Sequence, residues 1–125
     1  KFGNEWICHD PYVQADHAYD PFDAFTKPTN NQSFLYFCQM IDVITGPEWA
    51  KKVPVELPIY NIAGAEDPVG QYGVGVEEVS KWLEDSGHKV KTKIYEGYRH
   101  EIHNYSDLKD EVEAGIIDFF KGCLD

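Results

Sequence analysis

The chain has 125 residues, enough for one domain with a hydrophobic core, and 42% of them are hydrophobic. It carries 22 acidic and 11 basic side chains, and this net charge of −11 argues against nucleic acid or an anionic membrane as its main partner. No apolar run is long enough to predict a membrane-spanning helix. Three cysteines without a metal-binding spacing indicate free thiols in a reducing compartment, so we expect a cytoplasmic protein.

Residues 1–50 predict a mostly helical and irregular segment that is not part of a sheet. Prolines at positions 11, 21 and 28 limit residues 1–30 to short helical turns. In residues 31–45, apolar side chains recur at steps of three and four, which predicts a helix with one apolar stripe that ends at Gly46-Pro47. The stripe consists of Phe34, Phe37, Cys38, Ile41 and Ile44.

Residues 51–125 alternate between strand and helix patterns. The apolar run 59–63, closed by Gly64, is typical of a buried parallel strand, and a helical stripe follows that ends at Gly87. An alternating strand at 90–95 with two lysines on one face is typical of a sheet edge, and a final helix is predicted over 107–123. This order predicts an α/β fold in which two parallel strands are joined by a right-handed crossover.

Two parallel strands are too few for an independent sheet, because most sheets contain about four to six. The first strand would also leave an apolar edge unpaired. We therefore expect more sheet from a missing N-terminal half, from a second chain or from a homodimer. The first residue, Lys1, is not a start methionine, which fits a longer polypeptide.

Each predicted strand is followed by a loop with a chemically useful side chain. Asp67 follows the first strand and His100 follows the second. Functional groups gather beyond the carboxyl ends of parallel strands, and a carboxylate with an imidazole makes up two thirds of a hydrolase triad. We interpret Asp67 as the acid that holds one imidazole tautomer and His100 as the base that shuttles the proton.

Both residues also have structural alternatives. Asp67 could instead cap the next helix or form an Asx turn, and His100 could be a surface histidine that is hydrogen-bonded to its loop. The adjacent Glu66 is a competing carboxylate, although neighbouring side chains in a loop should diverge. A metal site at His100 and His103 is a weaker alternative, because the two histidines are one position too close for a zinc-binding helical pair and no third ligand is evident.

Other candidates carry less information. Glycines at positions 70, 73 and 75 lack the Lys-Ser/Thr that closes a phosphate loop, which favours turn and helix-start roles. His9, His17 and His88 have no partner pattern. None of the four serines lies in a G-x-S-x-G turn, so the chain by itself lacks a recognisable nucleophile and is predicted to be inactive alone.

Two motifs resemble the α/β-hydrolase superfamily. Residues 57–70, with D-P-V-G at 67–70, resemble its acid strand and loop, and residues 95–102, with R-H-E-I at 99–102, resemble its histidine loop. The closest resemblance is to the serine aminopeptidase and lysophospholipase (monoacylglycerol lipase-like) branch. The stretch W-I-C-H-D at 6–10 resembles, more loosely, the entry to the lid of that branch.

The resemblance implies the C-terminal portion of an α/β-hydrolase. Residues 51–125 would be the last two parallel strands with flanking helices, and residues 1–50 would be lid-like. It implies a serine hydrolase of carboxylic, lipid-type esters that needs no cofactor or metal, with Asp67 and His100 as triad acid and base. The nucleophile and oxyanion donors would lie on earlier strands. The alternative is a non-catalytic binding or structural module that retains a hydrolase-like shape.

Overall fold

The computed structural model of the chain describes residues 3–23 and 29–124. Helices surround a small sheet in which two strands run parallel. The elements in chain order are α1 (Pro11–Tyr19), α2 (Asn31–Ile44), α3 (Pro47–Ala50), β1 (Ile59–Gly64), α4 (Val74–Asp85), β2 (Val90–Tyr95), the 3₁₀-helix η1 (Ile102–Asn104) and α5 (Lys109–Leu124).

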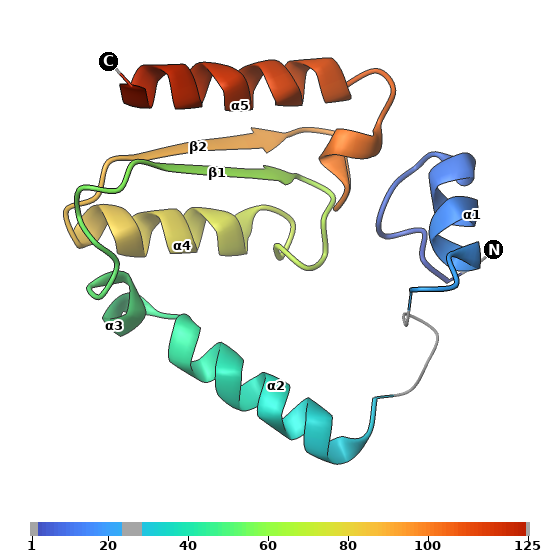
Figure 1. Cartoon of the computed structure of the whole chain (residues 1–125), viewed down its shortest axis with the longest axis horizontal. Coiled ribbons are helices and arrows are strands. Elements are labelled where there is room, and N and C mark those ends of the chain that lie inside the picture. Colours follow the sequence, from blue (N-terminus) through green and yellow to red (C-terminus); the bar gives the residue numbers. More distant parts are fainter. Residues whose placement is uncertain (1–2, 24–28, 125) are drawn as a thin grey trace.

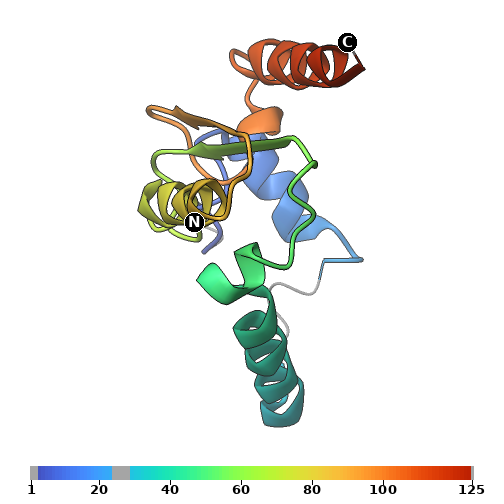
Figure 2. The same cartoon turned by 90° about the vertical axis from the view of Figure 1, so that its left-hand side faces the viewer.

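The sheet lies between two helices. Helix α4 connects β1 to β2 and covers one face, while α5 covers the other face (Figure 1). The same three layers are visible when the molecule is turned by 90° (Figure 2). The register pairs Ile59 with Val90 and Gly64 with Tyr95, so both strands end at the same edge of the sheet. The predicted α/β fold with two parallel strands is therefore confirmed.

The alternation predicted for β2 sorts its side chains between these two helices. On one face, the Thr92 hydroxyl donates to Ser80 Oγ of α4 at 2.7 Å, and Asn61 of β1 donates to the same oxygen at 2.8 Å. On the other face, Lys93 pairs with Glu111 of α5 at 2.5 Å, and its ammonium lies 4.5 Å from the centre of the Tyr95 ring. A period of two in the sequence thus separates the faces in space.

Two predicted turn positions are explained by backbone geometry. Gly73 precedes α4 with φ +88°, and Gly87 follows this helix with φ +94°, conformations that L side chains rarely adopt. Gly73 also lies against Ile94, since an added Cβ would be 3.3 Å from an Ile94 methyl group. The predicted helix-start role of this glycine is confirmed.

The segment before the sheet contains the short helix α1 within residues 1–30 and the longer helix α2 where residues 31–45 predict one. The short helix α3 lies at the start of the stretch 48–58, which the sequence indicates only as a connection. Proline occupies the first turn of α1 and of α3, the helix position that tolerates its missing N–H. The proline at position 28 lies outside the described residues. Helix α2 projects away from the sheet (Figures 1 and 2), and its predicted stripe is largely uncovered, with Phe34 59% and Phe37 53% exposed.

The main hydrophobic cluster lies beneath the loop that follows β2. It joins the N-terminal segment, the 3₁₀-helix and the start of α5 rather than the centre of the sheet. Its buried members are Ile7, Cys8, Tyr95, Ile102, Tyr105, Leu108 and Val112. None of the helices in the described residues combines the length and the apolar character that a membrane crossing requires.

The close approach at Gly64 generates a stability prediction. An added Cβ would lie 2.2 Å from the carbonyl oxygen of Tyr98, and a backbone atom cannot move aside cheaply. We expect Gly64→Ala to lower the free energy of unfolding by about 1–3 kcal/mol or more in urea denaturation. Gly122→Ala is the control, because nothing lies within 4 Å of its added Cβ and helix propensity favours alanine. Equal stability of the two variants would contradict the assigned contact.

Candidate active site

The structure brings Asp67 and His100 together at the adjoining ends of the two strands. The distance from His100 Nδ1 to Asp67 Oδ2 is 2.9 Å. A carboxylate only accepts hydrogen bonds, so this bond requires the proton on Nδ1, and in a neutral ring the lone pair is then on Nε2. The Asp67 side chain is 7% exposed and the His100 side chain 41% exposed. The pair therefore has a buried acid and an imidazole that is open to solvent.

Asp67 is held by its own loop through its second oxygen. Its Oδ1 accepts from the backbone N–H of Val69 at 2.8 Å, which is an Asx turn. Its backbone carbonyl accepts from the N–H of Tyr72 at 2.8 Å. The structural and functional interpretations of this aspartate therefore coexist, since one oxygen shapes the loop and the other faces His100.

Strand pairing continues into the loops that carry the two residues. The N–H of Ala65 donates to the Tyr95 carbonyl at 2.9 Å, and the N–H of Glu66 donates to the Tyr98 carbonyl at 2.8 Å. The absent side chain of Gly64 makes this approach possible. The position of Asp67 relative to His100 is thus set by backbone contacts that extend beyond the regular strands.

Tyr105 fixes the histidine loop from below. Its buried hydroxyl accepts from the backbone N–H of His9 at 3.0 Å and of Arg99 at 3.1 Å. Burial raises the pKa of this hydroxyl, and the two N–H donors partly oppose the shift. A neutral tyrosine therefore anchors the residue just before His100.

The N-terminal segment forms one wall of the site, which sequence reasoning did not foresee. The N–H of Glu101 donates to the Ile7 carbonyl at 2.8 Å. The ring of Trp6 lies 5.1 Å from that of His100, centre to centre, at an angle of 50°. The W-I-C-H-D stretch was the only signal in the sequence, and its resemblance to a lid entry gave no partner for these residues.

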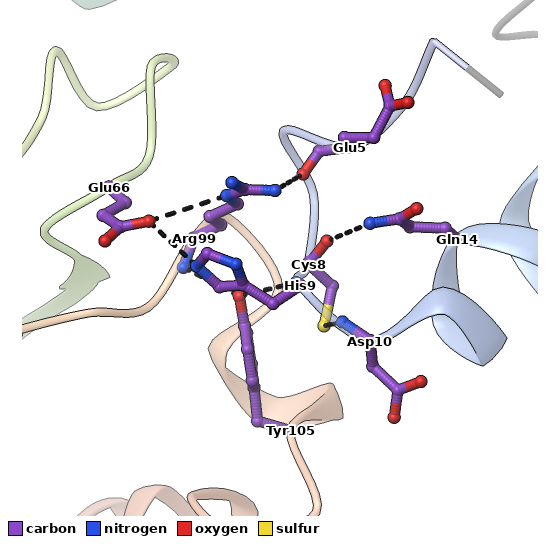
Figure 3. A network of polar contacts seen from close by, with 8 residues as sticks. All are labelled: Glu5, Cys8, His9, Asp10, Gln14, Glu66, Arg99 and Tyr105. Atoms are coloured by element: carbon purple, nitrogen blue, oxygen red, sulfur yellow. Dashed lines mark hydrogen bonds and ion pairs between the residues drawn. The ribbon is translucent and has the colours of Figure 1, made fainter. Parts of the chain in front are cut away.

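Glu66 diverges from His100, as expected for a neighbour of Asp67. It accepts from His9 Nε2 at 2.8 Å, and its Oε2 lies 3.6 Å from Nε of Arg99 (Figure 3). The Arg99 guanidinium also donates to the Glu5 carbonyl. His9, which has no partner pattern in the sequence, is therefore joined to both loops of the site.

The other sequence candidates lie apart from this pair. Within residues 3–23 and 29–124, no three His, Cys, Asp or Glu side chains are arranged to hold a metal ion, and His103 is an exposed residue of the 3₁₀-helix. The hydroxyls of Ser80 and Ser86 donate to carbonyls within α4, at 2.9 Å and 2.8 Å. In the described part of the chain, no serine hydroxyl forms a hydrogen bond with His100.

Removal of the Tyr105 hydroxyl tests its anchoring role. Tyr105→Phe leaves two partly buried N–H groups without their acceptor, which we expect to lower the free energy of unfolding by about 1–2 kcal/mol. Tyr12→Phe is the control, because that side chain is 84% exposed. We expect less than about 0.5 kcal/mol there. A Tyr105→Phe variant as stable as the control would refute the anchoring role.

The raised pKa of Tyr105 also predicts a pH dependence. In the unfolded chain a tyrosine ionises near pH ~10, whereas the folded chain keeps this hydroxyl protonated at higher pH. Its contribution to stability is therefore complete below about pH 10 and is lost as pH rises through the folded-state pKa. We expect Tyr105→Phe to reduce the fall in unfolding free energy as the pH rises above about 10, measured by urea denaturation. An identical fall in both proteins would contradict this.

Comparison with known proteins places this geometry in context. No family model and no curated protein sequence matches the chain. Over its whole length, the chain is similar to a highly thermostable carboxyl esterase from Bacillus coagulans in complex with glycerol, with 60% identity and a TM-score of 0.95. Over 94% of its length, it is similar to a lipase in an open form, with 31% identity and a TM-score of 0.85.

The chain spans 40% of the esterase structure and 38% of the lipase structure. Its two parallel strands and flanking helices therefore correspond to part of a larger fold. These similarities are consistent with a piece of an α/β-hydrolase, the superfamily that the acid and histidine loops resemble.

Proposed function

We propose that this chain supplies the acid and the base of a serine hydrolase that acts on carboxylic esters. The observation that carries the proposal is the 2.9 Å hydrogen bond between Asp67 and His100 at adjoining strand ends. It fixes the imidazole tautomer that a general base requires. The similarity to a carboxyl esterase at 60% identity extends over both loops and supports the same assignment.

In this mechanism a serine from outside the chain attacks the acyl carbon of the ester. Nε2 of His100 takes the hydroxyl proton as the new C–O bond forms and returns it to the alcohol that leaves. Asp67 stabilises the imidazolium between these steps and does not itself become protonated. Water then attacks the acyl-enzyme, with His100 again as base. General acid–base transfer of this kind contributes roughly 10²–10⁴-fold to the rate.

The nucleophile requires further polypeptide. We place this polypeptide at the unpaired edge of β1. In the described residues β1 pairs only with β2. A groove of about 750 Å³ lies beside β1, and it is lined by residues of β1, α4 and α2 but by none of β2. Its apolar lining includes Ile41, Ile62, Val76 and Trp82. An added strand would bury this surface, and the remaining length of the esterase structure supports a longer polypeptide over a homodimer.

Residues 1–50 would be lid-like in the complete enzyme. The exposed aromatic and aliphatic side chains of α2 suit an acyl chain, which favours a lipid-type ester and supports the lysophospholipase-like branch.

The three cysteines form no disulfide, and Cys8 is buried, which supports a cytoplasmic location.

A chimera tests the proposal directly. The part of the Bacillus coagulans esterase outside the aligned region is joined to this chain, and hydrolysis of nitrophenyl esters is measured. We expect turnover, with kcat reduced at least ~10³-fold by His100→Ala and roughly 10³–10⁴-fold by Asp67→Asn. His103→Ala is the matched control, an exposed histidine of the next turn, and we expect it to retain activity.

The possible outcomes separate the enzyme from a binding module. A fluorophosphonate probe should label the serine of the chimera, and should label it much more slowly in the His100→Ala variant. A folded chimera with neither turnover nor labelling would favour the non-catalytic module. Full activity of the His100→Ala variant would refute the role assigned to this histidine.

A further inference from the structure

Each residue of the acid–base pair is preceded by an ionisable residue, and the two preceding residues also contact each other. Glu66 precedes Asp67 and Arg99 precedes His100. The distance from Glu66 Oε2 to Arg99 Nε is 3.6 Å. The same two loops are therefore joined twice, at consecutive residues. Only the contact between Asp67 and His100 belongs to the proposed chemistry.

A third segment is tied to the same carboxylate. His9 donates through Nε2 to Glu66 Oε2 at 2.8 Å (Figure 3). It belongs to the same N-terminal stretch as Trp6, whose ring contacts that of His100. The backbone N–H groups of His9 and Arg99 share the Tyr105 hydroxyl. Both residues are thus fixed at the backbone, and their side chains converge on Glu66.

The energetics of these contacts favour a local role. The three side chains are 27–47% exposed, and exposed ion pairs contribute little to global stability. The His100 side chain, however, is itself 41% exposed, and among the described residues its ring bonds to Asp67 and contacts the ring of Trp6. A proton-transfer site requires groups that are fixed within roughly 0.5 Å. Because so few contacts hold the ring, a modest restraint on its loop is expected to change how often the ring faces Asp67.

We infer that Glu66, Arg99 and His9 form a clamp that positions His100 against Asp67. The three are positioning residues, since they act through the loops and do not touch the reacting atoms. The clamp also makes the N-terminal segment part of the site: loss of that segment's contact with Glu66 would loosen the histidine loop. The catalytic consequence rests on the proposed function, whereas the effect on the ring can be measured without turnover.

The test is nuclear magnetic resonance of the ¹⁵N-labelled 125-residue chain, in which the imidazole nitrogen shifts report the tautomer of each histidine. We expect His100 to be mainly the Nδ1–H form. Glu66→Gln and Arg99→Gln should each reduce the ratio of Nδ1–H to Nε2–H forms roughly twofold to fivefold. The double variant should show no further loss, because either change alone opens the contact.

Glu101→Gln is the matched control. It removes the same charge beside His100, but its side chain bonds to Asn104 and lies outside the clamp. We expect the His100 tautomer ratio to stay unchanged in this variant. If Glu66→Gln and Glu101→Gln lowered the His100 tautomer ratio equally, the loss of a negative charge would explain the change, and the clamp would be overturned. An unchanged ratio in both clamp variants would also overturn it.

His9→Gln provides the same readout if either loop variant loses its dispersed amide spectrum. The His9 side chain is 44% exposed and lies outside both loops that carry Asp67 and His100, so its replacement leaves those loop sequences intact. A lowered ratio supports the clamp and an unchanged ratio contradicts it. An inactive chimera with a responsive His100 tautomer would refute the proposed function alone, and an active chimera with an unresponsive tautomer would refute the clamp alone.

Discussion

The parallel pairing of β1 with β2, continued past the ends of both strands, is the constraint on which the site depends. It places Gly64 against the carbonyl groups of Tyr98 and Arg99, at a distance that leaves no room for a side chain at this position. The backbone brings the carboxyl group and the imidazole to the same edge, and the hydrogen bond between them follows from that placement.

The hydrophobic cluster supports the same edge from below. Ile7, Cys8 and Tyr105 pack where the N-terminal segment crosses the histidine loop, and the tyrosine hydroxyl uses its buried position to satisfy two backbone donors. Stability and function are therefore coupled in this region. The groups that keep the cluster together also keep the residue before His100 in place.

On the opposite side of the molecule, the sheet of the described residues has two strands and β1 keeps an unpaired edge. One strand edge adjoins an apolar groove, and α2 exposes aromatic side chains that the described residues do not cover. Both features fit a chain that spans about two fifths of the solved structures it is similar to. Asp67 and His100 thus lie on a chain that corresponds to part of a larger fold.

The sequence by itself determined both strands, the longer helices and the order of the two site residues, because hydrophobic periodicity and turn residues are local properties. The strands at 59–63 and 90–95, the helix after Asn30 and the loop positions of Asp67 and His100 all follow from spacing alone. Only the tertiary structure decided which side chains meet. His9 reaches Glu66 across 57 positions and its N–H reaches Tyr105 across 96, contacts that arise from packing of distant segments and leave no trace in local pattern.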